Sequence, residues 1–137
     1  MVSVEAKDFC ELIGLVMKLH ADGTFSSEME VDQRHLSIAA RVHGGVLASM
    51  LDTTLGGAVF AGIPKGKGCA TLSFNIHFFR PVTAGRLSCT ARIGNISRQT
   101  AYATGEIHDE RRRLIASATA IFFLTPTVEQ TPEVFAP

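Results

Sequence analysis

The segment of the chain with the clearest chemical potential is Val42-His43-Gly44-Gly45-Val46, which stands where a long apolar run begins. Backbone N–H groups in the first turn of a helix have no partner within the helix, and the helix dipole favours negative charge beside them. Two glycines at such a start let another group approach the backbone closely. The segment therefore predicts donors for a developing oxyanion, as acyl transfer requires. The alternative is that Gly44-Gly45 only allows tight packing of the helix start.

Asp52 is the one charged residue in the apolar stretch from Val46 to Ala61. A buried carboxylate without partners is costly, so it must be paired, hydrogen-bonded or functional. As a functional group it can act as a base or as a nucleophile. As a structural group it would accept hydrogen bonds from nearby hydroxyls, for which the candidates are Thr53, Thr54 and Thr71.

The spacing between Gly44 and Asp52 bears on how they could act together. Eight positions separate them, which corresponds to about 12 Å along one helix. A base or nucleophile must come within about 3 to 3.5 Å of the carbon it attacks, while the oxygen of that carbon points at the donors. We therefore expect Asp52 of a neighbouring copy to complete the site, giving two equivalent sites related by a two-fold axis.

The elements that must position these residues follow from hydrophobic periodicity. Residues 4–19 have near-helical spacing and predict a short N-terminal helix. Residues 44–61 leave almost no polar face and predict a long buried helix. A two-residue period predicts strands over residues 25–31, 69–78, 85–93, 101–108 and 114–124, with turns at Gly94-Asn95 and at Asp109-Glu110-Arg111. A tail containing prolines, from about residue 126, is expected to lie outside the folded body.

These elements predict a single α+β domain over residues 1–137, in which an antiparallel sheet of about five or six strands wraps around one long central helix. This arrangement is called the hotdog fold. One sheet around one helix leaves a sheet face or edge to be closed, so at least a homodimer is expected. A homotetramer is equally compatible with the pattern.

Composition indicates which classes of partner and cofactor the chain is not expected to bind. The 13 basic and 13 acidic side chains cancel, so the chain lacks the broad positive field of proteins that bind nucleic acids or membrane surfaces. The three cysteines form no C-x-x-C pair and the histidines have no metal-ligand spacing, so we predict no disulfide, metal or cofactor. Charges near the N-terminus break any signal-peptide core, and a cytoplasmic location is predicted.

Two separated motifs carry a resemblance to a known family. The segment from His43 to Asp52 resembles the HGG-x6-D motif of PaaI-type hotdog acyl-CoA thioesterases, which act in phenylacetic acid degradation and belong to the 4-hydroxybenzoyl-CoA thioesterase superfamily. The segment from Thr71 to Pro81 resembles the strand of that family that ends in F-x-R-P, and Gly85 follows it as in the family. The resemblance extends from about Asp32 to Leu124.

The resemblance implies hydrolysis of an acyl-CoA thioester to a free acid and CoA. It assigns the Gly44 amide to the thioester carbonyl and Asp52 of the other subunit to the attack, as nucleophile or as water-activating base. Thr71 stands where the family has a Ser or Thr that hydrogen-bonds the carboxylate or its water. Without the resemblance, Thr71 reads as a good strand former. His43 could orient the helix start or lie near the thiol leaving group, and a capping or packing role is the alternative.

The remaining predicted site residues surround the same segment. Gly45, Arg80 and Arg41 are predicted to contact the substrate, the two arginines through the phosphates of CoA, with Lys65, Lys67 and Arg98 as further candidates.

Two positions depart from the family, which usually has Asn at the position of Ser37 and Gly at that of Ala40. The Asn helps to position the substrate carbonyl or water, so Ser37 keeps open the alternative of a hotdog protein that binds acyl-CoA without turnover. A hotdog dehydratase ranks last, because Asp52 has no sequence-evident His partner.

Overall fold

The computed structural model describes residues 8–126 of the chain. The helices are α1 (Phe9–Ile13), the 3-10 turn η1 (Gln33–His35) and the 19-residue α2 (Gly44–Gly62). The strands are β1 (Val16–Leu19), β2 (Phe25–Glu30), β3 (Gly68–Phe78), β4 (Arg86–Ile96), β5 (Thr100–His108) and β6 (Leu114–Thr125).

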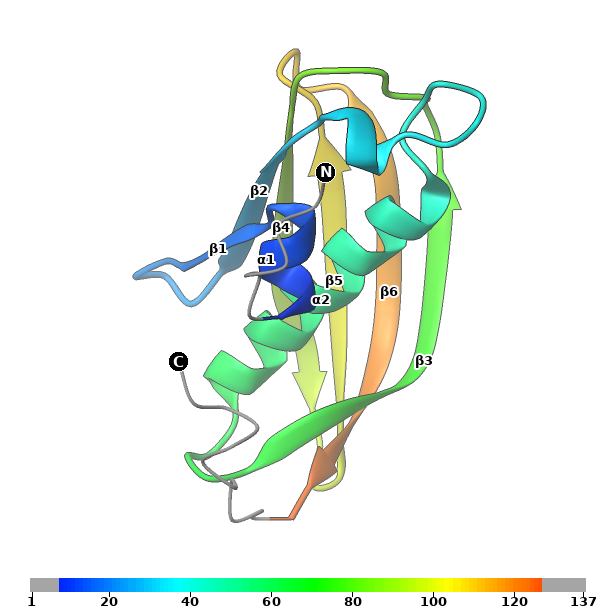
Figure 1. Cartoon of the computed structure of the whole chain (residues 1–137). Coiled ribbons are helices and arrows are strands. Elements are labelled where there is room, and N and C mark those ends of the chain that lie inside the picture. Colours follow the sequence, from blue (N-terminus) through cyan, green and yellow to red (C-terminus); the bar gives the residue numbers. More distant parts are fainter. Residues whose placement is uncertain (1–7, 127–137) are drawn as a thin grey trace.

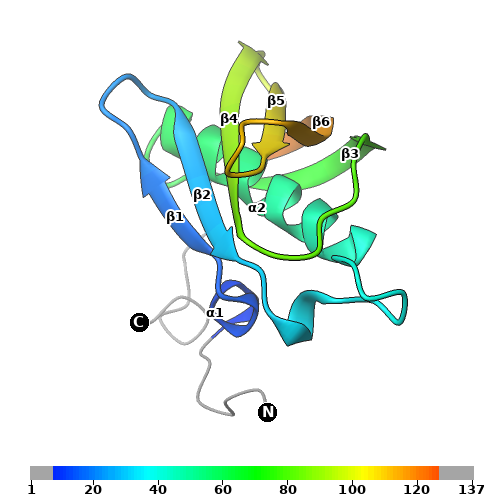
Figure 2. The same cartoon turned by 90° about the horizontal axis from the view of Figure 1, so that it is seen from above.

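All six strands form one antiparallel sheet in the order β1-β2-β4-β5-β6-β3. β4, β5 and β6 follow one another in the sheet as an antiparallel meander, and β3, which precedes them in the chain, pairs with β6. The sheet curls around α2 and leaves β1 and β3 as its two edges (Figures 1 and 2). The predicted hotdog arrangement, a sheet wrapped around one central helix, is therefore confirmed.

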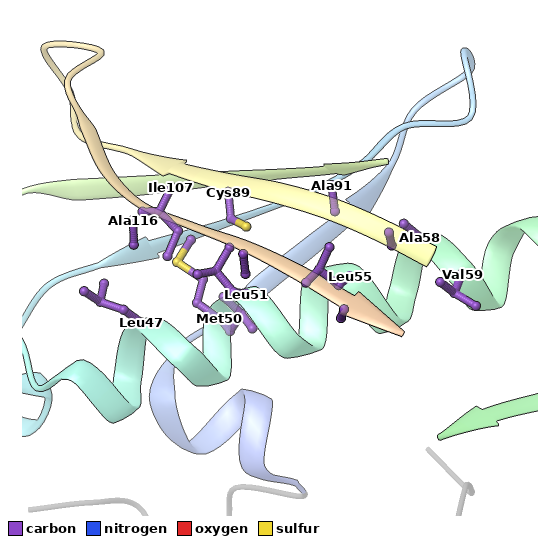
Figure 3. Close-up of a cluster of buried hydrophobic side chains, with 14 of the residues drawn as sticks. Leu47, Met50, Leu51, Leu55, Ala58, Val59, Cys89, Ala91, Ile107 and Ala116 are labelled. Carbon is purple, nitrogen blue, oxygen red and sulfur yellow. The ribbon is translucent and has the colours of Figure 1, made fainter. Parts of the chain in front are cut away.

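The core lies between α2 and the concave face of the sheet. Seven residues of α2 are buried: Leu47, Met50, Leu51, Thr54, Leu55, Ala58 and Val59. Figure 3 shows the α2 side chains directed at residues of the sheet that include Cys89, Ala91, Ile107 and Ala116. By length and composition alone α2 could cross a membrane, a property that it shares with the central helices of other folds.

The predicted helix over residues 4–19 is wrong beyond Ile13. Gly14 adopts a left-handed conformation, with φ of 72°, and ends α1 as its C-cap. The apolar residues that follow belong to β1, which pairs with β2 through contacts such as Val16 with Glu28. The apolar residues of so short a segment fit a helix and an exposed edge strand equally well. The segment forms a strand because it pairs with β2. Residues 4–7 lie outside the described part of the chain.

Two strand predictions also need correction. β4 continues through the predicted turn at Gly94-Asn95 to Ile96, because a bulge between Ile93 and Asn95 absorbs Gly94. The two-residue period over 69–78 groups Leu72 with Phe74, Ile76 and Phe78, but in β3 a shift in register between Thr71 and Ser73 turns Leu72 away from α2, and Leu72 is exposed. The strand starts at 68 and ends at 78, close to its predicted bounds. Of the predicted tail only Pro126 is described, and the rest lies outside the described residues.

Candidate active site

The first turn of α2 leaves one backbone donor without a partner. His43 is the N-cap: its Nδ1 accepts the Gly45 N–H at 2.8 Å, and its carbonyl accepts the N–H groups of Val46 and Leu47 at 2.9 and 3.4 Å. Within residues 8–126, the Gly44 N–H donates to no protein acceptor. It stands at the positive end of the helix dipole, where it can stabilise a developing negative charge.

A cavity of about 420 Å³ opens beside Gly44. Its wall contains five of the residues predicted from the sequence: Ser37, Arg41, His43, Gly44 and Arg80. The rest of the wall is mostly apolar and includes Leu47, Phe78, Phe79 and Val82. A pocket with an apolar wall, two guanidinium groups and a free N–H donor suits a ligand with an apolar part, a carbonyl and anionic groups.

A short hairpin over residues 35–43 presents Ser37 and Arg41 to the cavity. Leu36 and Val42 form an isolated antiparallel bridge, and the Ser37 N–H donates to the Arg41 carbonyl at 2.7 Å. Ala40 takes a left-handed conformation, with φ of 59°, at the position where the thioesterase family that the sequence resembles usually has Gly. The loop therefore makes its tight turn with an alanine, at some cost in backbone strain.

Asp52 and Thr71 form a second group further along α2. The Thr71 hydroxyl donates to Oδ1 of Asp52 at 2.8 Å, which places the predicted partner at the predicted carboxylate. The carboxylate accepts no other side-chain hydrogen bond from the described residues, so Oδ2 is available for chemistry. Cys69 lies nearby, where burial raises the pKa of its thiol and the Asp52 charge raises it further.

The bulge in β3 is what aims Thr71 at Asp52. Beyond the bulge, Phe74, Ile76 and Phe78 pair with the buried residues of β6 and face α2. Before it, Thr71 pairs with buried Phe122 and so also faces α2, although it lies an odd number of positions from Phe74. Strict alternation along β3 would have directed Leu72 at the helix instead of Thr71.

The two groups remain apart within one chain. Asp52 and Thr71 do not line the cavity beside Gly44, and about 12 Å of helix separates Asp52 from Gly44. Gly45 does not line the cavity either, and its N–H is already taken by His43. A methyl group on Gly45 would lie 2.9 Å from Nδ1 of His43, so the glycine makes room for the cap.

The described residues contain no group of three or more His, Cys, Asp or Glu side chains that could hold a metal ion. All three cysteines are free, and burial raises the pKa of Cys89 to about 12.

Sequence reasoning missed the apolar wall of the cavity and the buried residue His35. The sequence motif from Thr71 to Pro81 contains Phe78 and Phe79, but it does not indicate that they line the cavity. The contact of His35 with the Ile13 carbonyl joins segments 22 positions apart, so the sequence does not reveal it, whereas its capping contact with the Asp32 N–H is local.

Several known proteins are similar to this chain in sequence and in fold. Residues 40–116 match the family model described as "Thioesterase superfamily". The phenylacetic acid degradation protein PaaI of Thermus thermophilus is 31% identical, over 83% of this chain and 96% of that one, with a TM-score of 0.75. A phenylacetic acid degradation-related protein of Ralstonia eutropha is 30% identical, over 83% and 87%, with a TM-score of 0.76. A protein of Bacillus halodurans, solved with CoA, is 26% identical, over 84% and 74%, with a TM-score of 0.76.

Proposed function

The chain belongs to the thioesterase superfamily and is a thioester hydrolase, and we propose that it cleaves acyl-CoA at a site built by two copies of the chain. The observation that carries the proposal is the unpaired Gly44 N–H at the start of α2, beside a cavity with two arginines. In this site the thioester carbonyl oxygen accepts the Gly44 N–H, which stabilises the oxyanion formed on attack. His43 holds the donor in place as the N-cap.

Asp52 of the partner subunit supplies the attack. Acting as a base, it takes a proton from water while the water oxygen adds to the carbonyl carbon. The C–S bond then breaks, and the CoA thiolate leaves and takes up the proton. Acting as a nucleophile, it forms a mixed anhydride with release of CoA, and water then hydrolyses the anhydride. Thr71 holds Oδ1 in either case and leaves Oδ2 to react.

The edge strand β3 is the proposed contact between the copies. It is 11 residues long, pairs only with β6 among the described strands, and leaves its other side open. The two half-sites lie toward its two ends: Phe78, its last residue, lies next to Gly44, where a methyl group on the glycine would be 3.4 Å from the ring, and Thr71, its fourth residue, binds Asp52. Antiparallel pairing of β3 with its copy brings these ends together.

The register of this pairing follows from the same contacts. Asp52 reaches the cavity of the partner if Thr71 lies opposite Phe78 of the partner subunit. Residues directly opposite each other in two paired strands lie on the same face of the sheet. Thr71 and Phe78 meet this condition, because both face α2. With Leu72 left out as the bulge, the register continues through Ser73 and Phe74 and places Asn75 opposite its own copy. The two-fold axis would then pass beside Asn75.

The CoA part of the substrate meets Arg41 and Arg80, which are both exposed at the cavity. A formally neutral protein must bind the CoA phosphates with locally placed cations, and guanidinium groups do this with paired hydrogen bonds. The Bacillus halodurans relative solved with CoA supports the same ligand here. We place the reaction in the cytoplasm, where free cysteines such as the three in this chain stay reduced.

The test measures thiol release from a panel of aliphatic and aromatic acyl-CoA thioesters. Asp52→Asn is nearly isosteric and keeps an oxygen for the Thr71 hydroxyl, so it removes the charge with little change of shape. We expect turnover to fall by about 10²-fold or more, because general-base and nucleophilic groups contribute on that scale. Glu106→Gln, an exposed carboxylate on β5, is the matched control and should keep wild-type turnover.

Binding must be measured beside turnover. Wild-type protein that binds acyl-CoA but releases no thiol from any ester would establish the binding-protein alternative and implicate Ser37. Unchanged turnover in Asp52→Asn would remove Asp52 from the mechanism.

A further inference from the structure

His35 is a buried polar residue that the proposed reaction does not use directly. Its side chain is 1% exposed, although the η1 turn around it is on the surface. The Asp32 N–H donates to Nδ1 at 2.9 Å, and Nε2 lies 2.6 Å from the Ile13 carbonyl. Because one partner is a donor and the other an acceptor, this pattern of contacts assigns the ring hydrogen to Nε2.

The backbone of His35 reaches the start of α2. The His43 N–H donates to the His35 carbonyl at 2.9 Å and closes the base of the hairpin over residues 35–43. His43 is the N-cap that precedes Gly44, so the position of His35 sets the position of the free donor. The same hairpin carries Ser37 and Arg41 to the cavity wall.

The side chain of His35 ties this hairpin to the end of α1. Ile13 is the last residue of α1, so the Nε2–H caps a carbonyl at the negative end of that helix. Arg34 reinforces the contact, because its Nη1 donates to the Leu12 carbonyl at 2.6 Å while its Nε binds Asp32. α1 is thereby part of the support of the cavity, although it contributes no residue to the wall.

We propose that His35 is a positioning residue for thioester hydrolysis, and that its Nε2–H bond to Ile13 fixes the Gly44 donor at the oxyanion. This inference rests on the proposed function. A misplacement of about 1 Å in a catalytic group can cost about 10²-fold in rate, so a single buried bond that holds the helix start has a large effect. Substrate affinity depends less on it, since the long side chains of Arg41 and Arg80 adapt to small shifts.

Two substitutions separate the bonds of the ring. His35→Gln places an amide N–H near the reach of Nε2 and keeps the bond to Ile13. His35→Asn places an oxygen near Nδ1, keeps the bond from Asp32 and loses the one to Ile13. We expect His35→Asn to lower kcat by about ten- to a hundredfold with little change in KM, and His35→Gln to stay within about threefold of wild type.

Ser27→Ala is the matched control for loss of a buried hydrogen bond. Ser27 is 1% exposed and bonds Thr54 in the core at 2.7 Å, with no hydrogen bond to the hairpin. It should lower the melting temperature and leave kcat per folded protein unchanged. Amide hydrogen exchange over residues 36–44 supplies a readout that does not need activity, and exchange should quicken in His35→Asn but not in Ser27→Ala.

The outcomes separate this inference from the proposed function. Wild-type protein that cleaves no thioester overturns the proposed function, and the exchange measurement still decides whether His35 holds the hairpin. If His35→Asn keeps wild-type kcat and exchange, or loses no more kcat than Ser27→Ala at equal loss of stability, the positioning role is refuted. Equal losses in His35→Asn and His35→Gln would also overturn it, because the bond to Ile13 would then not be the one that matters.

Discussion

Thr71 has two roles to be separated at its position, that of a strand former and that of a partner for Asp52, the proposed catalytic carboxylate. Its hydroxyl lies 2.8 Å from Oδ1 of Asp52, and the bulge in β3 turns it toward the helix. A hydrogen bond to a charged group contributes about 1.5–3 kcal/mol, so its loss would free the carboxylate to adopt other rotamers.

Substitution at Thr71 tests which role matters. We expect Thr71→Val, which keeps the β-branched shape, to lower kcat by about tenfold or more because Asp52 is no longer oriented. Thr71→Ser keeps the hydroxyl and should retain most of the activity. Steady-state kinetics on one acyl-CoA ester, with melting temperatures as a check on folding, make the comparison. Wild-type kcat in Thr71→Val would leave only the strand-forming role.

At the residue scale, the sequence predicted the hydrogen bond between Thr71 and Asp52 and the start of the helix at Gly44, but not the residues around them. Gly44, Asp52 and Thr71 follow from motifs in which residue type and spacing carry the chemistry. The apolar wall at Phe78 and Phe79, and the support from His35, depend on segments brought together by folding. No local pattern reports such contacts.

The adjacent glycines Gly56 and Gly57 in α2 show how closely the central helix packs against the sheet. A methyl group on Gly57 would overlap the ring of Phe25 on β2, with 2.7 Å to its Cζ. A methyl group on Gly56 would meet only the ring of Phe122, at an ordinary 3.5 Å from Cε1. The two positions therefore have the same intrinsic helix cost but different packing.

Alanine substitutions at these glycines should change stability in opposite directions. Alanine is favoured over glycine within a helix by about 1 kcal/mol, so we expect Gly56→Ala to raise the free energy of unfolding by up to that amount. Gly57→Ala forces overpacking that costs about 1–3 kcal/mol, which outweighs the helix gain and lowers stability. Urea unfolding of both variants at one protein concentration measures this. A Gly57→Ala protein as stable as Gly56→Ala would show that Phe25 moves aside at little cost.

Element prediction succeeded where the periodic pattern was long and failed where it was short. α2 and the meander of β4 to β6 have enough residues for the period to be unambiguous. The described part of the predicted helix, from residue 8 to residue 19, divides into α1 and β1 because Gly14 ends the helix and β2 offers a partner. The bulges in β3 and β4 depend on register with neighbouring strands, which a single segment does not encode.

At the scale of the whole molecule, the proposed site requires two copies of the chain. One chain holds a donor at the start of α2 and a carboxylate two turns further on, and the fold keeps them toward opposite ends of β3. The spacing of Gly44 and Asp52 in the sequence predicts a second copy, and the shared site stays a prediction. The sequence did not predict the register, because the bulge that sets it appears only in the paired sheet.

Cysteine crosslinking tests the proposed two-fold axis beside Asn75. Residues directly opposite each other in antiparallel strands have Cβ atoms about 4.5–5.5 Å apart, close to the range that a disulfide bridges. We therefore expect Asn75→Cys to form a covalent dimer on mild oxidation, as seen on a non-reducing gel. Ser73→Cys and His77→Cys should each fail to crosslink alone and succeed when mixed, because each lies opposite the other residue in the partner.

Wild-type protein under the same oxidation is the control for crosslinking through the native cysteines. Turnover of acyl-CoA by the crosslinked dimer then shows whether this strand register is compatible with an active site. A covalent Asn75→Cys dimer that still cleaves acyl-CoA would have its β3 strands in the register that brings Asp52 to the Gly44 donor of the other subunit. Crosslinking of Ser73→Cys alone would shift the axis and move Asp52 away from the oxyanion. In that case the two half-sites could not act on one thioester, and the shared site would have to be abandoned even if the protein remained a dimer.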